Sequence, residues 1–312
     1  MKKVVKTLLV AILGLGATAP IFASDDGAGQ AAAYLKMGVG ARALGMGSAF
    51  TAVADDSTAA FWNPAGLAKL KKHEASFMHS NLTDDRDYNF FNYAHVLNAN
   101  NGKSNNGVLA LSHINFGIDG IPITNEDADG NPITDGNGNV KIEGYFEDKE
   151  TNTFLSYGRA INDKFYAGVN VKYLKHKLYD GKADTMGFDL GFLYDCDEKT
   201  SLGLSVRDIG ETLDWNTGTK DDVPVTTTFG VAHQCNDKLL VAADINKVKD
   251  MDCKFFCGVD YKIHENVNLR VGSHDSDLTL GASFKLDTWR FDYSYADETL
   301  GDAHRISCSK TF

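Results

Sequence analysis

The sequence is poor in basic residues and in proline. Its 312 residues include 31 Lys and Arg against 42 Asp and Glu, which gives a formal net charge of −11 at pH 7, and only 5 prolines. Affinity for nucleic acid rests on clustered Lys and Arg, so this charge balance argues against a nucleic-acid partner. Apolar residues make up 43% of the chain and aromatic residues 11%. They run through almost the whole length, which argues against disorder.

Long hydrophobic runs are also missing. A transmembrane helix needs about 20 consecutive apolar residues, whereas the longest run, 8–23, is shorter and contains Pro20. Three lysines stand in the first six positions, before this run, and Ala23 ends it. A basic start, a short apolar stretch and a small residue for cleavage are typical of a secretory signal peptide. We therefore predict that residues 1–23 are a signal peptide and that the chain is exported.

Cysteines are few and show no metal-binding pattern. The five lie at positions 196, 235, 253, 257 and 308, with no Cys-x-x-Cys pair and no histidine at a metal-ligand spacing. Cys253 and Cys257 fall in one predicted strand, where about 3.3 Å per residue separates them by roughly 13 Å. That distance is too long for a disulfide. We interpret the thiols as small packing residues and predict no metal centre and no cofactor.

From about residue 74 onward, apolar residues recur at every second position. In 164–176, for example, Val169 and Val171 alternate with Asn170 and Lys172. This period is that of a β-strand with one apolar face. Fourteen such runs can be counted, and they start near residues 73, 87, 105, 150, 164, 182, 199, 224, 237, 252, 266, 276, 288 and 302.

The connections between these predicted strands alternate in length. Tight turns are expected at 161–163, 195–199, 235–237, 264–266 and Asp287. Longer loops are expected at 119–149, 210–223, 247–251 and 296–301. An even number of strands, with short turns at one end and longer loops at the other, is typical of outer-membrane β-barrels. In such a barrel the apolar face contacts membrane lipid and the opposite face lines the lumen.

Exported β-sandwiches and soluble barrels also alternate, and three features favour a membrane barrel over them. Strands of about 9 to 11 residues or more can cross a bilayer at a tilt, whereas strands of soluble proteins usually have about 5 or 6. The chain stops within its last predicted strand, so that fourteen crossings return it to the periplasm and place 119–149 outside. Four aromatic residues fall near the short-turn end, where an interfacial girdle is expected: Tyr194, Tyr261, Trp289 and Phe312.

We therefore predict an all-β fold, a 14-stranded antiparallel transmembrane β-barrel over residues 73–312, in the outer membrane of a Gram-negative-type bacterium. Residues 31–72 are rich in Gly and Ala and lack strand alternation. They are expected to form small helical turns and close-packed loops, which would suit a plug inside the barrel. The predicted parts are a signal peptide (1–23), an N-terminal hatch (24–72) and the barrel.

A resemblance to a known family lies in the stretch AAAYLKMGVGARALGMGSAFTAVADDSTAAFWNPAGLA, residues 31–68. This stretch resembles the opening of the PorV/PorQ group, within the wider FadL-like outer-membrane proteins. The segments 120–124, 188–191 and 300–307 are similar to that group as well. The most specific element is Asn63-Pro64-Ala65-Gly66, which matches the NPA turn of FadL-like proteins. The resemblance implies a fourteen-stranded barrel with a hatch, and a C-terminal insertion signal that Ile306, Cys308 and Phe312 fit while Lys310 does not.

The resemblance implies two different functions. FadL-like proteins pass long-chain fatty acids or other hydrophobic compounds across the outer membrane, which makes hydrophobic small molecules the expected partners. PorV-like proteins serve type IX protein secretion, which makes secretion components or exported proteins the partners. We favour passage of hydrophobic compounds, and Asn63 and Pro64 would then either shape a turn that holds the hatch or contact the solute.

Two further site hypotheses are weaker. Asn125, Asp127 and Asp129 have a spacing reminiscent of a calcium loop, but position twelve is Gly136 instead of a bidentate Glu, so solvated turn residues are the favoured interpretation. Acid–base catalysis is not expected, because a polar barrel interior needs such residues to solvate one another. The lumenal residues considered are Asp189, Arg207, Asp260, Arg270 and Asp292. We predict that the protein is not an enzyme.

Overall fold

The structure is a computed structural model. It describes residues 30–82, 86–97, 99–100, 103–104, 106–135, 137–298 and 301–312. The predicted signal peptide, 1–23, lies outside the described residues, as does Gly136. Among the residues described, no helix is both long and apolar enough to cross a membrane.

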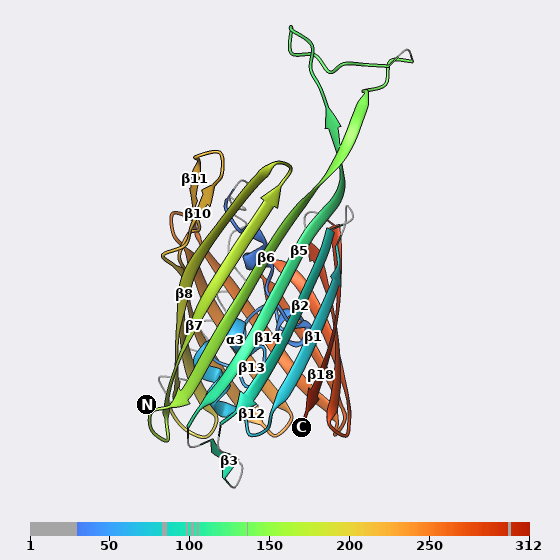
Figure 1. The fold of residues 1–312 in the computed structure, drawn as a ribbon. Helices are drawn as coiled ribbons and strands as arrows, with labels where there is room; N and C mark the ends of the chain where they lie inside the picture. Colours follow the sequence, from blue (N-terminus) through green and yellow to red (C-terminus); the bar gives the residue numbers. More distant parts are fainter. Residues whose placement is uncertain are drawn as a thin grey trace.

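Fourteen strands form a closed antiparallel barrel (Figure 1), which confirms the predicted fold class. The sheet closes because β1 pairs with β18 and β8 pairs with β9. The barrel strands are β1 (Glu74–Asn81), β2 (Arg86–Val96), β5 (Val108–Thr124), β6 (Ile142–Ala160), β7 (Phe165–Leu178), β8 (Gly181–Asp195), β9 (Thr200–Ile209), β12 (Thr226–Asn236), β13 (Leu239–Val248), β14 (Cys253–His264), β15 (Val267–His274), β16 (Asp277–Leu286), β17 (Trp289–Glu298) and β18 (Gly301–Thr311).

The alternation of the sequence becomes an alternation between the two faces of the wall. In β5, Leu109 and Leu111 are 37% and 51% exposed on the outside, while Ala110 and Ser112 are buried against the interior. Successive side chains of a strand point to opposite faces, so the same pattern on every strand produces a broad apolar outer surface. The predicted girdle residues Tyr194, Tyr261, Trp289 and Phe312 are all exposed.

The connections depart from the prediction at both ends of the barrel. The segment 119–149 is not all loop, because β5 and β6 continue as a paired ribbon beyond the rim as far as Thr124 and Ile142 (Figure 1). At the short-turn end, which also carries the C-terminus, the connection between β2 and β5 is long and holds β3 (Ala99–Asn100) and β4 (Lys103–Ser104). At the opposite, long-loop end, 179–180 and 275–276 are two-residue turns.

The ribbon was missed because its sequence, EGYFEDKE over 143–150, has charged residues on both faces and no continuous apolar face. A strand that extends past the barrel needs no apolar face, so period-two hydrophobicity disappears there although the backbone pairing continues.

A second addition at the long-loop end is the hairpin of β10 (Thr212–Trp215) and β11 (Lys220–Asp222), in which β10 extends the edge of β8.

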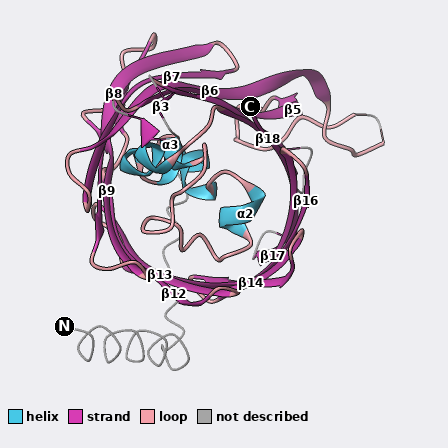
Figure 2. Cartoon of the chain, turned by 90° about the horizontal axis from the view of Figure 1, so that it is seen from below, coloured by secondary structure: helices cyan, strands magenta, loops and turns pink. Residues whose placement is uncertain are grey.

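Residues 30–72 lie inside the barrel, and we call this segment the hatch (Figure 2). It contains four short helices: η1 (Ala33–Met37), α2 (Ala41–Leu44), α3 (Ala59–Trp62) and η2 (Pro64–Lys69). Most of its residues are buried, including Val39, Met46, Phe50 and Leu67. The domain boundary at residue 72 stays a prediction.

Candidate functional site

The hatch touches the inner wall directly with its backbone, at a row of glycines. Gly158, Gly168 and Gly191 are paired in neighbouring strands β6, β7 and β8. A Cβ added to any of them would lie 2.3–2.4 Å from an atom of Asn63 or Pro64. Cβ atoms do not approach heavy atoms so closely, so only glycine fits. The row continues around the barrel with Gly203 at Thr51, Gly258 and Gly272 at Met46, and Gly281 at Gly45.

Asn63, the first residue of the predicted NPA block, joins the hatch to this row. It is fully buried, and its Nδ2 donates to the carbonyl oxygens of Thr51 at 2.9 Å and Phe192 at 3.0 Å. Its Oδ1 accepts from the backbone N–H of Ala65 at 3.2 Å and so caps η2, whose first residue is Pro64. Both amide hydrogens are therefore used within the protein. This geometry suits a turn that holds the hatch better than a direct solute contact.

A second side of the hatch faces β1 and β14–β17, which we call the charged sector, and an ion pair joins the hatch to β17 there. Asp56 in the hatch accepts from Arg42 at 2.9 Å and from Arg290 on β17 at 2.9 Å. Arg290 also donates to Asp292 at 2.9 Å. Burial alone would raise the pKa of Asp56, but the guanidinium groups of Arg290 and Arg42 hold it well below its ordinary value. The hatch carboxylate therefore stays ionised between two cations.

The same sector encloses a polar cavity of about 180 Å³. Arg270 bridges its wall, because Nε donates to Asp260 at 2.8 Å and Nη1 to Asp292 at 3.2 Å. The cavity lining is Arg42, Asp55, Asp56, Glu74, Asp260, Asn268, Arg270, Lys285 and Arg290. Sequence reasoning identified Asp260, Arg270 and Asp292 as lumenal, and the structure brings these three together. It missed Arg42, Asp55, Asp56 and Arg290, although charged residues inside a Gly- and Ala-rich stretch were a usable signal for the first three.

A buried carboxylate on β13 adds a further attachment. Asp244 Oδ2 accepts from the backbone N–H groups of Phe50 at 3.1 Å and Thr51 at 2.9 Å. On β18, Ser307 Oγ accepts from the backbone N–H of Ala41 at 2.8 Å. Hydrogen bonds to backbone donors that have no helical partner satisfy groups that would otherwise be buried unpaired.

The wall of β1, β2 and β5 near the long-loop end has the opposite character, and we call it the apolar sector. Its buried, inward-facing side chains form two cross-strand rows: Met78, Phe90 and Ile114 in one, and Tyr88 and Phe116 in the other. Tyr34 of the hatch stacks on Phe116 with ring centroids 5.8 Å apart. Side-chain packing makes this contact, and a hydrogen bond from the Gly40 N–H to Met78 Sδ at 3.0 Å also joins the hatch to this sector.

A third group of buried charges lies on β7–β9. The ammonium of Lys172 is 3.0 Å from Asp189 Oδ1 and 2.9 Å from Glu211 Oε1, and it also pairs with Asp208. Asp189 is one of the lumenal residues named from the sequence. The other, Arg207, stacks over the ring of Phe61 in the hatch at 4.7 Å. Both arrangements place lumenal charges next to groups of the protein that they can contact, as expected for a polar barrel interior.

The remaining predicted residues lie away from the hatch. Ile306 and Phe312 point outward on β18 or after it, Cys308 is half-buried, and the Phe312 N–H donates to the His73 carbonyl oxygen at 2.9 Å. Their role in membrane insertion stays a prediction.

The calcium-like segment forms turns in the ribbon. Asp127 Oδ1 accepts from the N–H groups of Asp129 and Asn131, both at 2.9 Å, and Asn125 donates to Glu143 at 2.7 Å. Two groups of three potential metal ligands exist among the described residues, and neither includes a residue of this segment.

No protein-family model matches the chain, and no functionally curated protein matches its sequence. Solved structures do match. The toluene transporter TodX of Pseudomonas putida superposes with a TM-score of 0.61 at 14% identity, over 88% of this chain and 98% of that one. The monoaromatic hydrocarbon channel CymD gives 0.60 at 15% identity, over 88% and 98%. A FadL homologue of Pseudomonas aeruginosa gives 0.55 at 13% identity, over 86% and 96%. At these identities the likeness establishes the barrel fold.

Proposed function

We propose that the protein is an outer-membrane channel that passes hydrophobic small molecules. The observation that carries the proposal is the asymmetric attachment of the hatch. An ion pair to Arg290 and hydrogen bonds from Ser57 to Glu74 hold it to the charged sector, whereas apolar and aromatic side chains pack it against the apolar sector. An apolar solute that enters the apolar sector replaces one apolar contact with another, so the free-energy cost of entry is small there. In the charged sector the same solute would leave buried polar groups without partners, and the free-energy cost would be large.

Two further observations support this proposal. The outer surface of the barrel carries apolar side chains on successive strands, as a lipid-facing wall requires. The structural neighbours TodX and CymD are described as a toluene transporter and a monoaromatic hydrocarbon channel, and they share the barrel fold. The solute class we propose is therefore small apolar molecules, with monoaromatic hydrocarbons and long-chain fatty acids as the first candidates.

The protein-secretion role implied by the PorV/PorQ resemblance finds no support in the structural neighbours. It stays a prediction, and one experiment separates it from the channel. The protein is extracted from native outer membranes in mild detergent, and mass spectrometry identifies the lipids, small molecules and proteins that co-purify. A bound apolar molecule at about one per barrel supports the channel. Enrichment of exported proteins without a bound apolar molecule contradicts it and supports the secretion role.

A further inference from the structure

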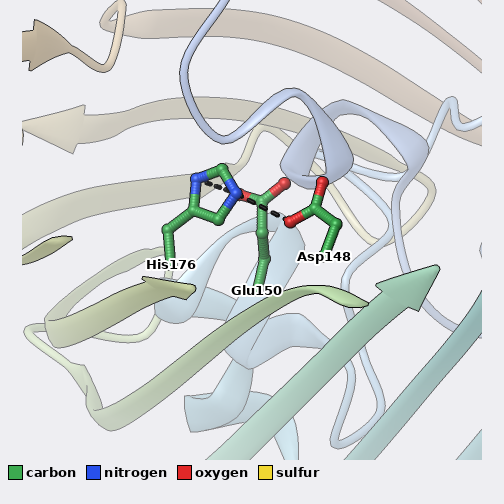
Figure 3. Close-up of side chains that lie close together, drawn as sticks. All are labelled: Asp148, Glu150 and His176. Atoms are coloured by element: carbon green, nitrogen blue, oxygen red, sulfur yellow. Dashed lines mark hydrogen bonds and ion pairs between the residues drawn. The ribbon is translucent and has the colours of Figure 1, made fainter. Parts of the chain in front are cut away.

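Three potential metal ligands meet on the inner face of β6 and β7, towards the long-loop end (Figure 3). Glu150 and His176 are directly opposite each other in the register of the two strands, and Asp148 lies two residues from Glu150 on the same face. Side chains in these positions of a sheet are within contact distance. His176 Nε2 is 2.8 Å from Asp148 Oδ1, and Nδ1 is 3.8 Å from Glu150 Oε2. The ligand atoms of all three lie within 4.8 Å of one another.

The charge of this cluster is not balanced by the protein. Within the described part of the chain, His176 is the only ion-pair partner of Asp148 and Glu150. Glu150 is only 8% exposed, and among the described residues the one charged group near its carboxylate is His176, with Nδ1 at 3.8 Å. Burial of an ionised carboxylate that lacks hydrogen bonds is costly. One imidazole, even when protonated, cannot neutralise two carboxylates, whereas a divalent cation does.

A second polar group nearby is also unsatisfied. Tyr34 is 3% exposed, and among the described residues its hydroxyl has no hydrogen-bond partner. Its ring stacks on Phe116, which pairs directly with Glu150 across β5 and β6. Burial raises the pKa of this hydroxyl, and among the charged groups around it the carboxylate of Glu150 raises that pKa most. A water molecule bound to an ion between the carboxylates is a partner that would satisfy it.

The neighbouring cluster of Asp189, Asp208 and Glu211 shows what is different here. There the ammonium of Lys172 pairs with all three carboxylates and occupies the position that a cation would take. No lysine or arginine of the described chain takes that position between Asp148 and Glu150. The two clusters lie on adjacent strands, and what sets Asp148, Glu150 and His176 apart is that, within the described chain, no ammonium or guanidinium group lies among their carboxylates.

We propose that Asp148, Glu150 and His176 bind one divalent transition-metal ion. Carboxylates alone would suit Mg²⁺ or Ca²⁺, but the imidazole shifts the preference toward Zn²⁺ and related ions. Three protein ligands leave an open position for water, as in sites that are not purely structural. The ion would join β6 to β7 near Tyr34 of the hatch.

The test is Zn²⁺ titration by calorimetry of the purified, detergent-folded protein after its cysteines have been alkylated with iodoacetamide, since free thiols also bind Zn²⁺. Wild type is expected to bind one Zn²⁺. His176→Ala and Glu150→Gln are each expected to weaken binding by at least about 10-fold, the lower end for loss of a group that supports a metal site. The control is His304→Ala, a histidine on the outer side that hydrogen-bonds to Tyr293 at 2.8 Å.

Folding of every variant is checked by its migration in gels with and without boiling. Glu150→Gln keeps the shape of the side chain, so it tests the proposal even if His176→Ala does not fold. Absence of Zn²⁺ binding by folded wild type would overturn the proposal. Equal Zn²⁺ affinity in wild type, Glu150→Gln and the control would overturn it too, as would binding of Mg²⁺ in preference to Zn²⁺.

Discussion

The charged and apolar sectors of the barrel interior hold the same hatch by different forces. In the charged sector, Asp56 lies between Arg42 and Arg290, and each contact has a fixed direction and length. In the apolar sector, Tyr34 stacks on Phe116 and neighbouring rings fill the space. Directional contacts fix the position of the hatch, whereas non-directional packing tolerates exchange. Under the proposed function, the charged sector is the anchored side of the hatch and the apolar sector is the side that an apolar solute enters.

The largest effect on the stability of the hatch is expected from removal of the Asp56 carboxylate, which lies between Arg42 and Arg290. Asp56→Ala leaves two partly buried guanidinium groups without their shared acceptor, and loss of one partner from a buried ion pair costs about 3–5 kcal/mol. Hydrogen exchange of residues 30–72 in the folded barrel should rise accordingly. The control is the adjacent Asp55→Ala, because the Asp55 side chain is 46% exposed and that of Asp56 only 3%. Equal protection in the two variants would contradict the anchored side.

The comparison also requires that the inner and outer faces are assigned correctly. Leu204 is exposed on the outside near the middle of β9. Leu204→Arg should lower the free energy of unfolding in lipid vesicles by about 2–4 kcal/mol, because it places a charge near the bilayer midplane. Tyr194→Arg, at the short-turn end, should cost only about 0–1 kcal/mol. If the two substitutions cost the same, the lipid-facing assignment is wrong.

The Asp56 contacts of the charged sector should be lost only at low pH. Asp56 has a pKa held below its ordinary value, so its contribution to stability is present above the unfolded pKa, about 3.9, and is lost only as the pH falls through the lower folded value. Hatch protection should therefore be the same at pH 7 and pH 5 and should decline only below about pH 4. Hydrogen exchange after incubation at each pH measures it. A decline already at pH 5 would show that another carboxylate controls the anchor.

Much of the fold could be predicted from the sequence. Each strand of the wall has one apolar and one polar face, so apolar and polar residues alternate along it, as Val169 and Asn170 do. The attachment of the hatch could not be predicted in the same way. Asp56 and Arg290 are separated by 234 positions, and no local pattern pairs residues that meet only after the barrel closes. The NPA block was found as a motif, yet its contact with Gly158, Gly168 and Gly191 depends on strand register. The cluster of Asp148, Glu150 and His176 was missed for the same reason, and because 119–149 was predicted to be a loop.

The central claim is tested most directly by uptake of an apolar solute into vesicles that contain the purified barrel. The critical pair is Phe90→Asn, inside the apolar sector, and Phe91→Asn, one position along on the outer face. An unpartnered polar group in a buried site costs about 1–3 kcal/mol, so Phe90→Asn should slow uptake of toluene or a long-chain fatty acid by about 10-fold. Phe91→Asn should leave uptake by the folded protein unchanged. Equal uptake by both variants, or wild-type uptake no faster than that of empty vesicles, would contradict passage through the apolar sector.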